Sequence, residues 1–187
     1  MHQRFLIDLH SILENTKPNS ADYDSAVTDL ADTVFTSGDY EDVLDYIERL
    51  LIREGKNSRI TFTAFYLLSV IYRRVCDRQK LQSLITLGAS RFDNYIDFKL
   101  IYLSCYEFCN PLGKSYTELL EDASALCSQF PDRPSCLNVY AHIVASLMES
   151  GVEVDSAYLN EAINSVNCAI SLDPSYSKYR VTRARLN

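Results

Sequence analysis

Residues 161–176 read EAINSVNCAISLDPSY, and this stretch decides how the rest of the chain is interpreted. Small and apolar side chains recur in it at helical spacing, at Ala162, Val166 and Ala169, and Pro174 follows five residues after the last of them. Because the residue before a proline is disfavoured in helical backbone, the stretch predicts a helix that ends just before Pro174. The residues behind the proline then predict a turn and one more helix.

Helical spacing of apolar residues continues through the whole chain, and only five glycines and five prolines interrupt its 187 residues. Few turn signals and no strict alternation over a strand length predict an all-α fold of about nine or ten helices. Asp39, Ser135 and either Asp155 or Ser156 are expected to cap helix N-termini, since short polar side chains accept bonds from the first helical N–H groups. The expected helices lie at residues 1–19, 20–36, 39–55, 60–75, 94–108, 115–130, 135–150, 156–173 and 175–187, with a further one opened by Asp77.

The formal net charge of -7 argues against a nucleic-acid-binding protein, because phosphate binding requires a basic face. The last residues are an exception, since no acidic side chain follows Asp173 and four cations do. We expect these cations to be solvated on a last helix, where their positive charge interacts favourably with the negative C-terminal end of the helix dipole. The alternative is that they form a site for a ligand or a partner. The four are Lys178, Arg180, Arg183 and Arg185.

Cysteine usage and hydropathy favour a reducing, cytoplasmic setting. The six cysteines include no C-x-x-C pair and no histidine at metal-binding spacing, so they are expected to be free thiols on helices. Cys105 and Cys109 are four positions apart and are expected to share a helix face, but two thiols without further ligands make no zinc site. The N-terminus carries an acidic residue at position 8 and does not resemble a signal peptide. No segment approaches the roughly 18 apolar residues that a membrane span needs.

The segment EAINSVNCAISLDP closely resembles the second half of a tetratricopeptide repeat, a helical hairpin of about 34 residues. The first half of that repeat has an aromatic residue, Leu-Gly and then Tyr, and a similar set with Ser for Gly is found at Phe65, Leu68, Ser69 and Tyr72. Leu81, Ile85 and Gly88 then fall on second-helix positions. The resemblance implies a right-handed α-solenoid of antiparallel hairpins in a single domain over 1–187. Its parts would be an N-terminal helix at 1–19, hairpins at 20–57, 58–95, 96–131 and 135–174, and a terminal capping helix at 175–187.

No catalytic signature occurs in the sequence, and the chain is not expected to be an enzyme or to need a cofactor. His2, His10 and His142 lie far apart in sequence, and neighbouring carboxylates on a helix point in different directions. His142 is expected either to face a groove or to be a surface residue. No catalytic residue and no metal site is therefore predicted.

In tetratricopeptide arrays the first helices of successive hairpins line a concave groove, and the resemblance places an apolar, aromatic floor with a basic rim there. The expected groove residues are Tyr66, Leu67, Val70, Arg73, Arg74, Ile101, Tyr102 and Cys105. The alternative is that the chain's own helices cover several of them. The carboxylate clamp of family members that bind acidic C-termini is not reproduced, since Asp29 and Asp32 occupy clamp-like positions and Thr182 replaces an expected Arg.

These features predict a non-catalytic scaffold or regulatory module that binds a peptide or helix of another protein, or of another domain of its parent chain. Self-association is also possible on this reasoning. The competing hypothesis is a sensor domain of a larger enzyme or signalling protein, in which Arg73, Arg74 and nearby tyrosines bind an anionic small ligand. The helix at 175–187 would be either a polar cap or the first half of a further hairpin, and the absence of a polar tail favours the latter.

Overall fold

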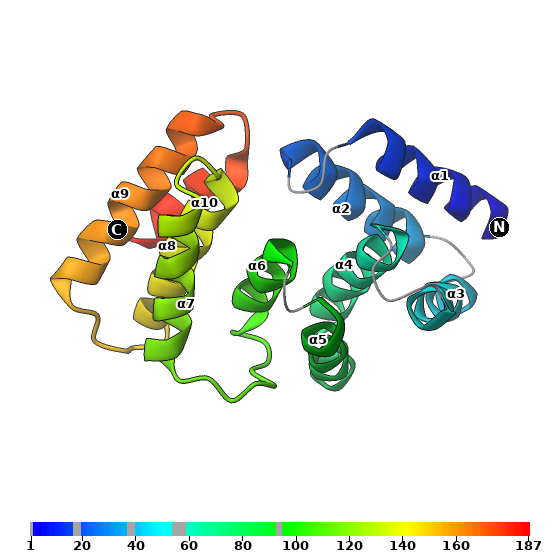
Figure 1. Cartoon of the computed structure of the whole chain (residues 1–187), viewed down its shortest axis with the longest axis horizontal. Coiled ribbons are helices and arrows are strands. Elements are labelled where there is room, and N and C mark those ends of the chain that lie inside the picture. The colour runs from blue at the N-terminus through cyan, green and yellow to red at the C-terminus, as the bar shows by residue number, and fades with distance from the viewer. Residues whose placement is uncertain (1, 17–19, 37–39, 54–58, 93–94) are drawn as a thin grey trace. The chain divides into compact units, whose positions relative to one another are not determined.

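The computed structural model describes residues 2–16, 20–36, 40–53, 59–92 and 95–187. Within these ranges the chain forms ten helices and no strand, which confirms the prediction of an all-α protein (Figure 1). The chain divides into two compact units, unit 1 (Met1–Phe98) and unit 2 (Lys99–Asn187), and the division falls inside α6. The helices are α1 (His2–Asn15), α2 (Ala21–Thr36), α3 (Tyr40–Arg53), α4 (Arg59–Arg74), α5 (Arg78–Phe92), α6 (Ile96–Cys105), α7 (Tyr116–Gln129), α8 (Pro134–Glu149), α9 (Ser156–Leu172) and α10 (Ser177–Arg185).

The predicted cap at Asp155 and the predicted helix start at Asp77 are confirmed. The Lys80 N–H donates to Asp77 Oδ1 at 2.9 Å at the start of α5, and the Ala157 N–H donates to Asp155 Oδ1 at 2.7 Å at the start of α9. The expected cap at Asp39, and the expected helix ends at 17–19, 37–38 and 55, lie outside the described residues.

Two predicted boundaries are wrong. Ser135 does not cap α8, because the helix begins one residue earlier at Pro134 with Arg133 in the N-cap position. Proline suits a first helical position, where its missing N–H would have had no helical partner. The helix expected at 94–108 ends at Cys105, whose carbonyl accepts from the N–H groups of both Phe108 and Cys109, and this tightening stops the helix.

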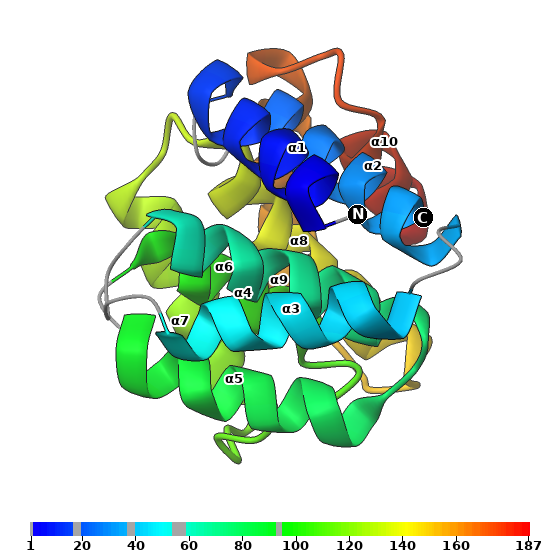
Figure 2. The same ribbon diagram turned by 90° about the vertical axis from the view of Figure 1, so that its right-hand side faces the viewer.

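Unit 1 packs α4 against α1, α2, α3 and α5, and Figure 2 shows α3, α4 and α5 lying side by side. Aromatic rings fill much of its core, with centroids 5.5 to 6.0 Å apart. Rings at these separations attract one another beyond the burial of their area. The rings belong to Phe62, Phe65, Phe92, Tyr95 and Phe98.

Unit 2 packs α8 against α7, α9 and α10, and α10 also packs against α9 (Figure 1). Small side chains let these helices approach closely, because an alanine adds little bulk between two helix axes. The fully buried alanines of this unit are Ala123, Ala141, Ala145, Ala162 and Ala169.

Unit 2 contains the same helix–turn–helix geometry twice. α7 ends with Phe130 as C-cap (φ -133°, ψ 63°), and 43 residues later α9 ends with Asp173 as C-cap (φ -140°, ψ 83°). The Phe130 N–H donates to the carbonyl four residues back, as does the Asp173 N–H, and a proline follows each cap. Three residues after each cap a residue in extended backbone starts the next helix without a side-chain cap. In each pair, a turn that contains a proline therefore joins the two helices in the same way.

A buried triplet at i, i+4 and i+7 precedes each of these turns and is also present in α5. We call these three positions the buried triplet of each helix. Its members face the neighbouring helices, as expected for one stripe of an amphipathic helix. They are Leu81, Ile85 and Gly88 in α5, Leu119, Ala123 and Leu126 in α7, and Ala162, Val166 and Ala169 in α9.

Candidate functional site

The groove residues predicted on α4 differ in exposure. Tyr66, Val70 and Arg73 lie at i, i+4 and i+7, which places them in one stripe along the helix, and all three are partly exposed. The Tyr66 ring packs against Tyr23 of α2 with centroids 5.8 Å apart. Leu67, in contrast, has no exposed surface and belongs to the core of unit 1. Unit 1 thus presents a short stripe with an aromatic, an apolar and a cationic side chain.

Arg74, at the end of α4, is paired within unit 1. Its guanidinium forms an ion pair with Asp32 of α2 and lies over the Phe35 ring, 5.8 Å from the centroid. Asp32 is one of the two acidic residues at the clamp-like positions identified from the sequence. The pair ties α2 to α4, so Arg74 has a structural partner at the position where a basic groove rim was expected.

The groove residues predicted on α6 are buried. Ile101, Tyr102 and Cys105 are 7%, 3% and 0% exposed. The Tyr102 hydroxyl donates to Asn110 Oδ1 at 3.1 Å, and burial raises the pKa of this tyrosine to about 12. These three residues belong to unit 2 and the α4 stripe belongs to unit 1, so the eight predicted residues are divided between the two units.

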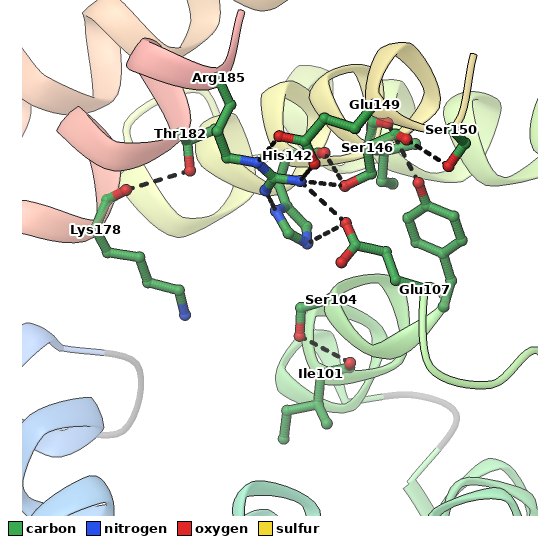
Figure 3. Close-up of polar contacts among 12 residues, drawn as sticks. Ile101, Ser104, Glu107, His142, Ser146, Glu149, Ser150, Lys178, Thr182 and Arg185 are labelled. Atoms are coloured by element: carbon green, nitrogen blue, oxygen red, sulfur yellow. Dashed lines mark hydrogen bonds and ion pairs between the residues drawn. The ribbon is translucent and has the colours of Figure 1, made fainter. Parts of the chain in front are cut away.

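A cluster of polar side chains around Arg185 is the most developed polar arrangement in unit 2 (Figure 3). The guanidinium donates from Nε to Glu149 Oε1 at 2.8 Å and from Nη2 to Glu149 Oε2 at 2.6 Å, a two-pronged pair with charge assistance. Nη2 also donates to Ser146 Oγ at 2.8 Å and to Glu107 Oε1 at 3.3 Å. One arginine of α10 thereby joins α8 and the turn that follows α6.

His142 completes this cluster on the side of α8. Arg185 Nη1 lies 2.7 Å from His142 Nδ1, and because a guanidinium can only donate, Nδ1 accepts. The ring proton then resides on Nε2, which faces Glu107 Oε1 at 3.5 Å. Ser146 uses both of its capacities, since its hydroxyl donates to the His142 carbonyl at 2.9 Å and accepts from Arg185. The cluster defined by Glu107, His142, Ser146, Glu149 and Arg185 is called the Arg185 cluster below.

Charge pairing dominates the electrostatics of the Arg185 cluster. The hydrogen bond from Arg185 lowers the pKa of Glu149, and the same bond raises the pKa of Arg185. The arginine side chain is 22% exposed, so the pair is screened by water only in part. With two carboxylates already bound, the guanidinium is neutralised, and an anionic ligand would have to displace one of them. The arrangement fits a bridge between helices and gives no binding position for an anion.

The expectation that all four C-terminal cations are solvated is wrong for Arg185, which is paired with Glu107 and Glu149, and the side chain of His142 is 16% exposed. The sequence held one signal for this cluster: His142, Ser146 and Glu149 recur at i, i+4 and i+7 on a mostly apolar helix, which places three polar groups on one face. Their partner in α10 lies 43 residues beyond His142, so periodicity alone did not identify it.

Two properties of the described residues bear on other classes of function. They contain no group of three or more His, Cys, Asp or Glu side chains arranged to hold a metal ion. Nor is any helix in the described part of the chain long and apolar enough to cross a membrane.

Comparison of the chain with protein families, with curated proteins and with solved structures finds no match.

Proposed function

We propose that this chain is a degenerate tetratricopeptide-like helical-repeat protein that acts without catalysis, as a scaffold or regulatory module that binds another protein. The observation that carries the proposal is the repeated geometry of unit 2, in which two helix–turn–helix segments, 43 residues apart at their C-caps, end and restart alike. Such repeats build their core by stacking neighbours and leave helix faces for partners. We place the hairpins in a right-handed solenoid and the protein in the cytoplasm.

The surface proposed for a peptide or helical partner is the α4 stripe of Tyr66, Val70 and Arg73. Its side chains are partly exposed, and they combine a ring, an apolar group and a cation within two helical turns. Aromatic and arginine side chains contribute most to the affinity of many protein interfaces. A partner segment with an apolar side chain beside a carboxylate would match this stripe. The partner is another protein or another domain of the parent chain.

The test is affinity capture from a cell extract with the wild-type chain and charge variants. Val70→Asp and Arg73→Glu should each remove a defined set of captured proteins, because a buried carboxylate or a reversed charge opposes the proposed contact. Arg49→Glu on α3 is the matched control, since that side chain is 60% exposed and lies on another helix. Capture of the same set by all four chains, with circular dichroism spectra unchanged, would refute the proposal for this stripe.

The competing hypothesis, an anionic small ligand bound near Arg73, predicts a different result. Thermal unfolding with a panel of nucleotides and phosphorylated metabolites should then show a higher midpoint that Arg73→Ala abolishes, because a ligand that binds only the folded state stabilises it. Under the scaffold proposal none of these compounds shifts the midpoint.

A further inference from the structure

The two helix pairs of unit 2 can be superposed in sequence without a gap, at the offset of 43 residues between their C-caps. Three positions that are buried in α8 then correspond to buried positions in α10 or at its C-cap. They are Cys136 and Tyr179, Val139 and Thr182, and Ile143 and Leu186. The two helices therefore turn the same face toward the rest of the unit, and any remaining difference in exposure between them concerns another face.

That other face is covered in α8 and open in α10. Leu137, Ala141 and Val144 are 7%, 0% and 0% exposed. Their counterparts are Arg180 and Ala184 in α10 and Asn187 just beyond its C-cap; all three are exposed, and Val181 is 60% exposed. In the described part of the chain α10 packs only against α8 and α9.

Helix α9 packs against α8 and contacts it next to this face. The Tyr140 hydroxyl, on the same side of α8, donates to Glu161 Oε2 of α9 at 3.0 Å. Ala162 follows Glu161 and opens the buried triplet of α9. The occupant of this face in α8 is thus a helix with a small-residue stripe that begins beside a carboxylate.

The open face carries more positive charge than the corresponding face of α8. The counterpart of Tyr140 is Arg183, and the counterpart of Leu137 is Arg180, so two cations replace a phenol and an apolar side chain. The printed sequence has no acidic residue after Asp173, and the bonds of these two arginines go to neutral oxygens. Arg180 donates to the Pro174 carbonyl at 2.9 Å, and Arg183 donates to the side chains of Asn167 and Asn187 at 3.3 and 2.6 Å.

These two arginines differ from Arg185, which is already neutralised by Glu107 and Glu149. Each guanidinium has five N–H donors, so both retain the capacity to bind a carboxylate. Arg183 occupies the position from which α8 contacts Glu161, so a carboxylate placed as Glu161 is placed would meet a cation. The rest of the face, Val181 and Ala184, is apolar and small enough for a close helix approach.

We propose that the face of α10 formed by Arg180, Val181, Arg183 and Ala184, the outer α10 face, binds an acidic amphipathic helix of a partner protein, seated on α10 as α9 is seated on α8. This surface belongs to unit 2 and is separate from the α4 stripe, so the inference goes beyond the proposed function. Charge pairing supplies the specificity, and the apolar stripe supplies the close contact.

The probe is a synthetic 18-residue helical peptide with alanine, valine and alanine at i, i+4 and i+7 and glutamates on both flanks. A second peptide carries lysines in place of the glutamates. Fluorescence anisotropy with the full chain should show binding of the acidic peptide and at least about tenfold weaker binding of the basic one, with an affinity that falls as salt rises. Equal binding of the two peptides, or no binding of the acidic one, would overturn the proposal.

Charge variants then locate the binding surface. Arg180→Glu and Arg183→Glu should each weaken the acidic peptide at least about tenfold, whereas Arg49→Glu on α3 should leave it unchanged. Arg183 bonds Asn167 of α9, so if Arg183→Glu alters the circular dichroism spectrum, Val181→Asp replaces it, since that side chain is 60% exposed. Undiminished binding in these variants would sink the assignment. So would self-association in sedimentation that Arg180→Glu abolishes, because a second copy of the chain would then occupy the face.

Discussion

The last position of the buried triplet is Gly88 in α5 of unit 1 and Ala169 in α9 of unit 2, and these two helices fill the space around it in opposite ways. A Cβ added to Gly88 would lie 2.6 Å from a ring carbon of Phe65 and 2.6 Å from one of Phe98, closer than real Cβ atoms approach. Ala169 keeps its methyl group and has no exposed surface. The space at this position of the triplet is thus filled in one of two ways. Large rings of neighbouring residues contact the glycine backbone in α5, and a small side chain of the helix itself fills the space in α9.

The largest effect is expected from adding bulk at Gly88. Gly88→Val should lower the free energy of unfolding by about 3 kcal/mol, because two rings that already pack against each other must move, and overpacking typically costs 1–3 kcal/mol or more. Gly88→Ala should cost about 1 kcal/mol, since alanine's helix propensity offsets part of the clash. Urea unfolding followed by circular dichroism measures both.

Trimming one of the two rings should relieve that clash. The double variant Gly88→Val with Phe98→Leu should be less destabilised than the two single losses added together, as expected for neighbours that share one space. If Gly88→Ala were more stable than the wild type, helix propensity would outweigh packing at this position, and the contrast between the two units would fail.

The reverse change should destabilise unit 2. Ala169→Gly should cost about 1.5–2 kcal/mol, of which about 1 comes from helix propensity and about 0.8 from one buried methyl group. Ala125→Gly is the matched control, because Ala125 lies on α7 of the same unit and is exposed, so it should lose only the propensity part. Equal losses in urea unfolding would mean that the methyl of Ala169 contributes no packing energy.

Sequence periodicity predicted much of this architecture. The all-α class, most helix boundaries, and the alignment of Pro131 and Pro174 behind their triplets all follow from local spacing. The helix ends at these prolines are determined by local sequence, because a proline restricts the backbone conformation of the residue before it, independently of the rest of the chain. Local sequence was insufficient to place the start of α8, where Ser135 was the expected N-cap and Arg133 occupies that position.

The contacts that depend on distant residues were not predictable in this way. Arg185 bonds Glu107 across 78 positions, and no periodicity links the turn after α6 to the last helix. The burial of Ile101 and Cys105 likewise follows from packing against other segments, because the hydropathy of a groove floor and of a core helix are alike. Whether the α4 stripe binds a partner stays a prediction.

Helix ends extend the comparison between the units. Cys76 lies two residues beyond the end of α4 with φ 55°, and Gly151 lies two residues beyond the end of α8 with φ 75°, in each case with the same pair of backbone bonds to carbonyls in the last turn. Left-handed backbone is strained for a residue with a Cβ and not for glycine. Gly151→Ala should therefore cost about 1 kcal/mol, and Cys76→Gly should stabilise unit 1 by about 0.5–1 kcal/mol.

Cys168→Gly is the matched control for this pair. It makes the same chemical change as Cys76→Gly at an exposed position inside α9, where it should cost a few tenths of a kcal/mol from lost helix propensity. Thermal unfolding of the three variants gives the signs directly. If Cys76→Gly and Cys168→Gly shift the midpoint in the same direction, backbone strain at Cys76 is not the cause.

The smallest effect concerns acid, and it follows from the way the last helix is held. The core of unit 1 is built on rings that do not titrate in acid, while α10 in unit 2 is joined to α8 through Glu149 and Arg185. Because Arg185 lowers the pKa of Glu149, the folded state binds this proton more weakly than the unfolded state does. The contribution of Glu149 is thus fully present above the ordinary carboxyl value of 4.5 and is lost as the pH falls through the lower folded value.

Glu149→Gln should remove this pH dependence and cost less than about 1 kcal/mol at pH 7, since the carboxylate is 53% exposed and screened by water. Urea unfolding at pH 7 and pH 3 should show a smaller loss on acidification for Glu149→Gln than for the wild type. Glu153→Gln, at an exposed position beyond the end of α8, controls for the removal of one carboxyl group and should keep the wild-type difference. Amide hydrogen exchange locates the effect, because loss of the pair should speed exchange in α10 before it does so in α4. Equal acid sensitivity of all three chains would show that the bond between Glu149 and Arg185 contributes nothing to stability, and the outer α10 face would then lie on a helix held by its other contacts with α8 and α9.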